Sequence, residues 1–548
     1  MYLILAALLL APVVVMGALV ALIVTKIKNG EATLSGIPEI ESTSKHWLYG
    51  HWRGFVDPKV HQYLAAQARL LGPIFRLRVV DTVICVLTDP VDISKMCCRG
   101  QDFQDKEASA YDPFNLIHWG PTTTNIVSMK TDDQWKLLRK GLSPCFSSTN
   151  MKLAMPVIQA ISANILDQIE AAGPTQAFDM LDAARRMTAE VIARWGFKMT
   201  FGGEDLLKPN ELVKLINQMF TAIHCLWMNP LYVFSLLTSK EARTHRTNTR
   251  AYDDYMAGVT RELQARPLDE LPSDCIAGAL MRVTQPSGEP LSFPQLKSNV
   301  AIMLAAGFET SASAINSAVL SLIQHPAELA RLEEELDAFG LLKTPTRPEP
   351  RAVEWDDLGR MTYLNAVIKE TLRLYPPASL GGMRATSKPT TLCGYDVPAG
   401  TWVLIPGCAL DRSIAVYGED ADEFRPDRWL SRSSDSGGKD GAGISWASTG
   451  AYDDEDAGGV ADQASAALVQ GPSAGRLKEP IAFSMGPRDC VGQALARLDA
   501  QVFLAMLFSR FRVSLAPGMD SPEEIWSKTA YHVTLAMPDG LWLCMASR

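Results

Sequence analysis

The sequence has no long basic block. Among its 548 residues, 61 are acidic and 52 are Lys or Arg, giving a formal net charge of −9 and an isoelectric point of about 5.5. A nucleic-acid-binding surface needs clustered positive charge. This balance therefore excludes nucleic acid as an expected partner.

The sequence also lacks any Cys-x-x-Cys pair. Its ten cysteines are scattered, and the adjacent Cys97 and Cys98 have neither zinc-ligand spacing nor the regularity of a disulfide scaffold. The pattern predicts reduced thiols in a cytosol-facing protein.

Residues 1–25 contain no charged side chain, and Lys26 and Lys28 follow them directly. About 20 apolar residues suffice for a membrane-spanning helix, whereas a cleaved signal peptide would have a charged start, a shorter apolar run and a clear cleavage site. We expect a single-pass anchor with the body of the protein in the cytoplasm, because positive flanks stay on that side. Residues 26–46 are mostly polar and predict a linker in which no core begins.

A hydrophobic content of 47% supports one large core. Two short runs rich in β-branched residues, 74–79 and 83–87, predict a β-hairpin. From residue 135 to residue 337, apolar residues recur at three- and four-residue spacing, with interruptions at prolines and glycines. The predicted fold is mainly α with small β-sheets.

Residues 295–325 predict an apolar helix that is interrupted by Gly307, Glu309 and Thr310. A glycine inside a helix costs roughly 1 kcal/mol relative to alanine, and a buried carboxylate costs more unless it is paired or hydrated. Two explanations remain open from this segment alone. It is either a glycine kink with Glu309 at a polar seam, or a functional interruption.

The most informative segment is 483–492, which places Cys490 on a glycine-bracketed loop directly before a predicted helix. Backbone N–H groups and the helix dipole favour a thiolate there. Gly486 and Gly492 allow close backbone approach, and Arg488 offers a planar donor group suited to a carboxylate. Phe483 would cover the sulfur.

The spacing Phe-x-x-Gly-x-Arg-x-Cys-x-Gly resembles the cytochrome P450 family. The resemblance implies that Cys490 is the axial ligand of iron in haem b, and that Arg488 binds a haem carboxylate. Residues 306–310 resemble the oxygen-activation signature of the family, in which a widened helix makes room for O₂ and water. Glu309 and Thr310 would then steer protons.

Glu370 and Arg373 stand at i and i+3 on a helix predicted over 364–375. On an exposed surface such a pair is routine and worth only about 0.5 kcal/mol. The resemblance implies instead that the pair is buried and joined by Arg428 from the Phe-x-Pro-x-Arg-Trp segment 424–429. Such a network would hold the core around the cysteine loop.

Two further basic positions fit the carboxylates of haem. Trp135 and Arg139 resemble the Trp-x-x-x-Arg helix of the family, whose spacing puts the indole N–H and the guanidinium on one side. Arg384, shortly after Pro377, is the other candidate. Lys136, Arg139 and Lys140 would lie near the side where an electron donor docks, although a solvated helix face explains these basic residues equally well.

Residues 431–478 depart from the family. They are rich in Ser, Gly, Ala and Asp and show no hydrophobic periodicity, which predicts a disordered surface insertion within the haem domain 47–548. A gene-model error that retains noncoding sequence would also explain them, as would a docking or regulatory loop with serines open to phosphorylation.

The resemblance implies a haem-thiolate monooxygenase that inserts one atom of O₂ into a lipophilic small molecule by hydroxylation or epoxidation. No flavin or ferredoxin domain is visible, so electrons would come from an NADPH-cytochrome reductase, with cytochrome b5 as a second donor, at the endoplasmic reticulum membrane. Two alternatives remain. One is an isomerase or dehydratase acting without O₂, against which Glu309 and Thr310 speak, and the other is a noncatalytic haem sensor.

The predicted pocket wall is apolar, which favours fatty acids, sterols, terpenoids or polyketides without choosing among them. We expect it to be formed by 111–119, 220–228, Ala305 with Phe308, 380–383 and the stretch near Val533.

Overall fold

The computed structural model describes residues 21–41, 45–98, 104–112, 125–201, 205, 208, 210–228, 239–430 and 479–548. Most of the predicted anchor and the whole of the predicted insertion 431–478 therefore lie outside the described residues. Within the part of the chain that is described, no helix is both long and apolar enough to cross a bilayer.

Helices dominate the described structure, as the apolar spacing predicts. They are α2 (Trp52–Val56), α3 (Val60–Leu71), α4 (Pro90–Cys97), α6 (Asp133–Leu142), α7 (Ser148–Ala172), α8 (Met180–Val191), α9 (Glu211–Met228), α11 (Lys240–Ala265), α12 (Ile276–Arg282), α13 (Phe293–Gln324), α14 (Pro326–Ala338), α15 (Trp355–Arg360), α16 (Thr362–Leu374), α17 (Gly407–Leu410), α18 (Ile414–Tyr417), α20 (Gln493–Arg510) and α21 (Pro522–Lys528). A capping box of Ser292 and Gln295 begins α13, because the two side chains satisfy backbone N–H groups that the first turn leaves free.

The strands form small sheets. They are β1 (Ile74–Val79), β2 (Thr82–Leu87), β3 (Phe178–Asp179), β4 (Gly382–Ala385), β5 (Thr390–Leu392), β6 (Tyr395–Val397), β7 (Trp402–Ile405), β8 (Phe511–Leu515), β9 (Ala530–His532), β10 (Thr534–Ala536) and β11 (Trp542–Ser547). The largest sheet has the order β1-β2-β7-β4, and β1 pairs antiparallel with β2 in the register Ile74 to Leu87. The predicted hairpin is confirmed.

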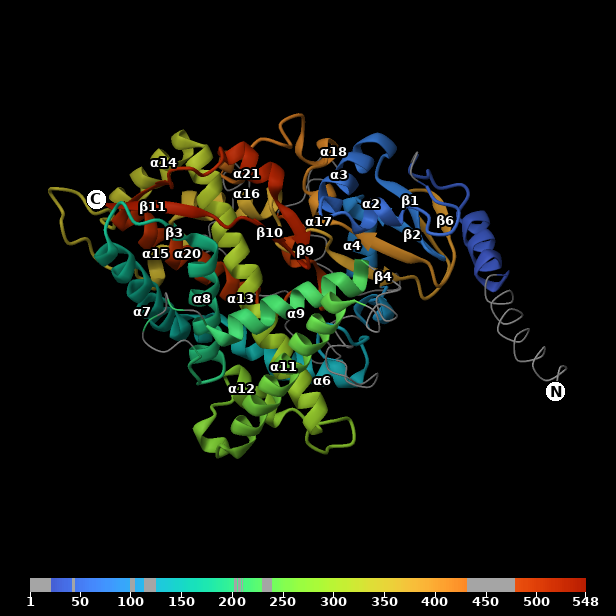
Figure 1. Ribbon diagram of the computed structural model, residues 1–548, viewed down its shortest axis with the longest axis horizontal. Helices are drawn as coiled ribbons and strands as arrows, with labels where there is room; N and C mark the ends of the chain where they lie inside the picture. Colours follow the sequence, from blue (N-terminus) through green and yellow to red (C-terminus); the bar gives the residue numbers. More distant parts are fainter. Residues whose placement is uncertain are drawn as a thin grey trace, which may run out of the picture.

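The two kinds of element separate in space. Figure 1 shows the sheet of β1, β2 and β4 on one side with α2, α3 and α4, and most long helices on the other. Helix α13 runs through the middle and contacts α8, α11, α16 and α20. Because α13 is buried along nearly its whole length, it forms the centre of the main hydrophobic core.

The expectation of a linker over 26–46 is wrong for its larger part. Residues 21–33 are helical, and Ile27, Leu34, Ile37 and Ile40 are buried. Leu34 and Ile37 belong to a hydrophobic cluster with β2, and the side chain of Glu31 accepts from Arg78 Nε at 2.9 Å. These apolar residues are spaced by three or more among polar ones, which is why composition alone hides their packing against the sheet.

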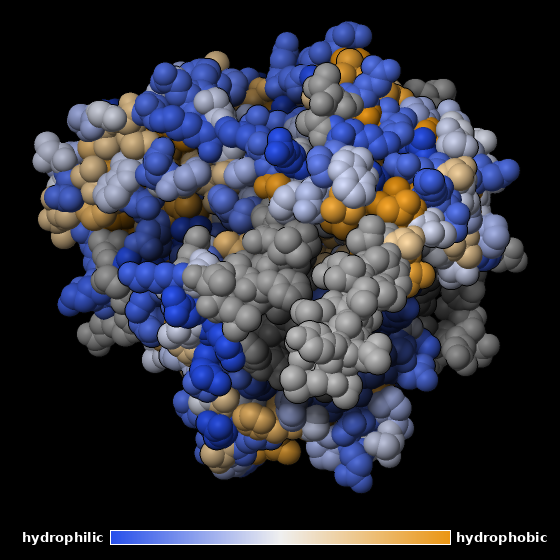
Figure 2. Space-filling model, turned by 45° about the vertical axis from the view of Figure 1, so that its right-hand side comes forward, coloured by the Kyte–Doolittle hydropathy of each residue, from blue (hydrophilic) through white to orange (hydrophobic). Residues whose placement is uncertain are grey.

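The described surface is largely hydrophilic. In the view of Figure 2, hydrophobic side chains form separate patches among hydrophilic ones rather than one continuous area. Large exposed apolar side chains include Leu22, Trp47 and Leu70. Scattered exposure of this kind is normal for a folded protein.

Candidate active site

The cysteine loop is a tightly bonded connection into α20. The backbone N–H of Cys490 donates to the carbonyl of Phe483 at 2.9 Å, and that of Asp489 donates to the carbonyl of Gly486 at the same distance. Gly486 has a φ of +73°, and a Cβ there would lie 2.0 Å from the backbone oxygen of Cys97. Only glycine fits this position, since both its conformation and its packing exclude a side chain.

A cavity of about 390 Å³ lies against this loop. Cys490 forms part of one wall and presents its accessible surface there, while Ala306, Gly307 and Thr310 of α13 form another. Burial raises the pKa of the Cys490 thiol, and a backbone hydrogen bond from Gly492 partly opposes it. A metal ion bound to the sulfur would favour the thiolate at this position.

The charged residues that line the cavity are mostly basic: Lys106, Arg139, Arg384, Arg488 and Arg497, against a single acid, Asp489. Burial, with other cations nearby, lowers the pKa of Arg488 to about 10 and that of Lys106 well below its usual value. Buried positive charge is costly unless it is compensated. The cavity thus suits a largely apolar group that carries anionic substituents.

Each predicted arginine lines the cavity and is also held by a hydrogen bond or an ion pair to another part of the chain. Arg139 Nη2 forms a short ion pair with the Asp489 carboxylate, and its Nη1 donates to the Asp489 carbonyl at 2.9 Å. Arg488 lies 3.5 Å from a carboxylate oxygen of Asp105, and Arg384 donates to the backbone of Gln104 at 3.0 Å. Because Arg139 is buried here, it is not on the exposed basic face with Lys136 and Lys140.

Trp135 contributes differently from the prediction. Its indole N–H donates to the carbonyl of Ile126 at 3.1 Å, and the guanidinium of Arg488 lies 4.5 Å from the centroid of its ring. A cation over an indole face is favourable. Trp135 therefore supports Arg488, and its indole N–H is bonded to the backbone.

Thr310 and Glu309 point in different directions. Thr310 lines the cavity, and its hydroxyl donates to the Ala306 carbonyl at 3.0 Å. Glu309 does not line it: its carboxylate accepts from Arg185 of α8 at 2.8 and 2.6 Å, and lies 3.5 Å from the hydroxyl of Thr534. Adjacent residues of an α-helix diverge by about 100°. Only one of the two predicted proton-steering residues therefore faces the cavity.

Close packing against a neighbouring segment explains why position 307 is a glycine. A Cβ at this position would lie 2.9 Å from Cδ1 of Ile192, in the π-helical segment Ile192–Gly196 that follows α8. Helix α13 is an uninterrupted α-helix through residues 306–310, so the widened turn implied by the resemblance is not present. The glycine brings α13 close to its neighbour within a continuous stretch of α-helix.

The family model for cytochrome P450 matches residues 41–538 of the chain. The chain belongs to the cytochrome P450 family. Similar proteins include the putative cytochrome P450 CYP13A10 of Caenorhabditis elegans, 22% identical over 92% of this chain and 96% of the relative. Cytochrome P450 4V2 of Rattus norvegicus is 24% identical over 76% of this chain and 73% of the relative.

As a cytochrome P450, the chain is a haem-thiolate monooxygenase, an oxidoreductase with haem b as its cofactor. Membership also implies a redox partner and a lipophilic substrate in general terms. The cavity fits this cofactor, because a cysteine sulfur, an apolar wall and several buried cations meet in one place.

The buried charge network of this cytochrome P450 has the predicted members. Both oxygens of Glu370 accept from Arg373, at 2.9 and 2.8 Å, and Arg428 donates to one of them at 2.8 Å. Sequence reasoning missed Trp429, whose indole N–H donates to Glu370 at 2.9 Å. Glu370 and Arg373 are fully buried, so the exposed-pair interpretation does not apply.

The residues that line the cavity agree in part with those predicted from the sequence. Tyr111, Phe220, Gly382 and Val533 line it as predicted, and residues 113–119 lie outside the described residues. Ala305 and Phe308 are buried elsewhere on α13. The other lining residues that sequence reasoning missed include Ile192, Tyr531 and Thr534. Their positions depend on tertiary packing, which no local pattern reveals.

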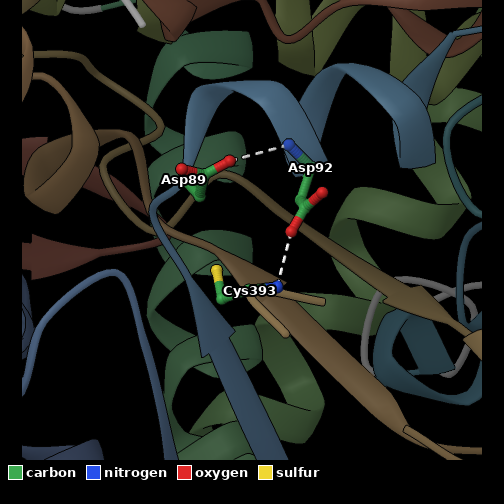
Figure 3. Close-up of side chains that lie close together, drawn as sticks. All are labelled: Asp89, Asp92 and Cys393. Carbon is green, nitrogen blue, oxygen red and sulfur yellow. Dashed lines mark hydrogen bonds between the residues drawn. The ribbon is translucent and has the colours of Figure 1, made fainter. Parts of the chain in front are cut away.

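A second group of potential metal ligands, Asp89, Asp92 and Cys393, is structural (Figure 3). Asp89 accepts from the backbone of Asp92 at 2.9 Å as the N-cap of α4, and Asp92 accepts from the backbone of Cys393 at 2.6 Å. Burial and the two carboxylates raise the pKa of the Cys393 thiol to about 12. Cys393 also does not line the cavity, whereas Cys490 does.

Proposed function

We propose that this cytochrome P450 inserts one atom of O₂ into a lipophilic small molecule, by hydroxylation or epoxidation, with Cys490 as the ligand of haem iron. The observation that carries the proposal is that Cys490 and Thr310 both line one largely apolar cavity. Bound haem supplies the activation of O₂ with electrons from a partner, and the protein supplies binding, orientation and protons.

The cysteine loop would hold the haem through several of its residues. Cys490 provides the sulfur, and Arg488, with Arg139 and Arg384, provides donors for the haem carboxylates. Gly486 gives the loop its close approach to Cys97. Phe483 lines the cavity next to Cys490 and limits access of water to the sulfur.

The proton supply would involve Thr310 and Glu309 in separate roles. The Thr310 hydroxyl lies in the cavity wall and can pass a proton to a group bound there. Glu309 is held by Arg185 one layer behind the wall, and the Thr534 hydroxyl lies between its carboxylate and the cavity. Glu309 would therefore act as a proton source that reaches the cavity through neighbouring hydroxyls or water.

The partners and location belong to the same proposal. The electron donor would be an NADPH-cytochrome reductase, with cytochrome b5 as a second donor, and the chain would be held by residues 1–25 at the endoplasmic reticulum membrane with its catalytic domain in the cytoplasm. The apolar cavity supports a membrane-partitioned substrate, because such a wall selects by shape and hydrophobicity.

The first experiment is the absorption spectrum of the reduced, carbon-monoxide-bound protein, measured for the wild type, Cys490→Ser and Cys393→Ser. The Soret band of thiolate-ligated haem is expected in the wild type and in Cys393→Ser, and its loss is expected in Cys490→Ser. Haem-loaded wild type without this band, or a Cys490→Ser variant that keeps it, would contradict the assignment.

The second experiment tests Thr310 in a reconstituted system with reductase and a panel of lipophilic compounds. Substrate should stimulate NADPH consumption, and Thr310→Ala should release more hydrogen peroxide for each product formed than Thr310→Ser, which keeps the hydroxyl. Turnover without O₂ or reductase would indicate the isomerase or dehydratase alternative. Unchanged coupling in Thr310→Ala would remove Thr310 from the proton path.

A further inference from the structure

Asn299 is a buried residue of α13 whose side-chain amide is hydrogen-bonded at both ends. It is 1% exposed and does not line the cavity. Its Nδ2 donates to the Gln295 carbonyl at 2.9 Å, and its Oδ1 accepts from the backbone N–H of Ile126 at 3.0 Å. Asparagine is a poor residue for a helix interior, and a buried amide costs free energy unless it is hydrogen-bonded. The bond to Ile126 therefore gives this residue a role outside its own helix.

Ile126 belongs to a tight turn formed by residues 125–128. The side-chain oxygen of Asn125 accepts from two backbone N–H groups later in the turn, at 3.0 and 3.1 Å. These bonds are internal, so they fix the shape of the turn but not its place against α13. Toward α13 the turn is held by the bond from Ile126 to Asn299 and by a longer contact of 3.4 Å from Asn125 Nδ2 to the Ser298 hydroxyl.

The same turn presents carbonyl oxygens to the cysteine loop and to α6. Arg488 Nη2 donates to the carbonyls of Ile126 and Val127, each at 3.3 Å, and the indole of Trp135 bonds to the first of them. The other terminal nitrogen of Arg488, Nη1, donates to the Thr131 hydroxyl at 3.1 Å. Because both Nη2 bonds end on the turn, a shift of the turn moves the guanidinium in the cavity wall.

We propose that Asn299 is a positioning residue, which fixes the turn 125–128 through the Ile126 amide and, through the carbonyls of the turn, fixes Arg488 beside the haem. Ile302 and Met303, at i+3 and i+4 on the same face of α13, line the cavity. One helix thus sets both the cavity wall and the place of this arginine. The inference rests on the proposed function, because it takes the cavity as the haem site.

The test compares Asn299→Leu, the smaller change Asn299→Ser and the matched control Asn365→Leu. Asn365 on α16 is also buried and bonded at both ends, donating to the Leu358 carbonyl at 2.8 Å and accepting from Gln501 at 2.5 Å. Both Asn299 variants should speed hydrogen–deuterium exchange of the amides in 125–129 on the order of fivefold, as expected for the loss of one neutral hydrogen bond. The control should leave this exchange within about twofold of the wild type.

The reduction potential of the haem is a readout that a general loss of stability does not move. A nearby positive charge favours the reduced iron, so displacement of Arg488 in the Asn299 variants should lower the potential, while Asn365→Leu should keep it. In an Arg488→Gln background, Asn299→Leu should lower the potential no further, because the two residues act in one path.

Several outcomes would overturn the inference. They are an unchanged potential in both Asn299 variants, an equal decrease in Asn365→Leu, and a full additional decrease in the Arg488→Gln background. Exchange is also measured on haem-free protein, so a variant that loads no haem still tests the contact, and unchanged exchange in 125–129 would overturn it too. Failure of the wild type to bind haem would instead contradict the proposed function.

Discussion

Replacing Glu370 with glutamine removes the single negative charge at the centre of the buried network. The carboxylate accepts from Arg373, Arg428 and Trp429 side chains and from the Arg425 backbone, all within 3.0 Å. Glutamine keeps the shape but offers one acceptor oxygen instead of two. Its NH₂ group faces donors, Arg373 loses its ionic partner, and Arg428 keeps only its longer ion pair with Asp420 at 3.5 Å.

The expected cost follows from burial. Glu370 and Arg373 have no exposed side-chain surface, and the side chain of Arg428 is 3% exposed. Removing one partner of such a buried pair costs about 3–5 kcal/mol. Native proteins are stable by about 5–15 kcal/mol, so the loss is about a fifth of the total stability at the least. Much of the Glu370→Gln variant should fail to accumulate as folded, haem-loaded protein.

Urea unfolding, followed by tryptophan fluorescence and by the carbon-monoxide spectrum, measures this loss. The control is Glu262→Gln, which makes the same chemical change in the exposed pair of Glu262 with Arg266 on α11. That pair should contribute less than about 1 kcal/mol. If Glu370→Gln unfolds within about 0.5 kcal/mol of the wild type and keeps its haem, the network does not have the stabilising role argued from its geometry.

Three further predictions concern Gly486 in the cysteine loop, the buried acid Asp411, and the ion pair of Arg185 with Glu309. Gly486→Ala should abolish haem-loaded protein, measured by haem content, because its Cβ would lie 2.0 Å from the Cys97 oxygen. Burial raises the pKa of Asp411 to about 7, so between about pH 4 and 7 the folded chain holds a proton that the unfolded chain releases, and stability falls as pH rises through this range. Asp411→Asn should make that decline smaller in urea titrations at successive pH values. Arg185→Gln should cost on the order of 3 kcal/mol by leaving Glu309 buried without its cation, and a second change, Glu309→Gln, should recover most of it.

For each of these three predictions, a specific experimental result would contradict the reasoning. Gly394 has a φ of +83° and open space around it, so Gly394→Ala should strain the backbone without a clash and keep the haem. Equal haem loss in both glycine variants would remove the steric argument. Parallel pH profiles for Asp411→Asn and the wild type would exclude Asp411 as the titrating group, and additive losses at Arg185 and Glu309 would show that the two do not interact.

Several conclusions could be reached from local sequence alone. The hairpin over 74–87, the helix over 295–325 and the cysteine loop before a helix are set by neighbouring residues, through β-branched runs, apolar periodicity and glycines with required backbone conformations. The network of Glu370, Arg373 and Arg428 was implied by the family resemblance, and the structure contains its hydrogen bonds.

Only the tertiary structure decided which way the functional side chains point. The resemblance grouped Glu309 with Thr310 as proton-steering residues, but Arg185 of another helix holds the carboxylate away from the cavity. The sequence left Lys106 unnoticed, because a single lysine in a loop has no pattern and its place in the cavity wall depends on the bridge to Arg384. The polar composition of residues 26–46 likewise predicts a linker, although Ile37 and Ile40 pack against strands more than thirty residues away in the sequence. Local pattern determines elements and motifs, whereas charge pairing and burial depend on residues distant in sequence that only the folded chain brings together.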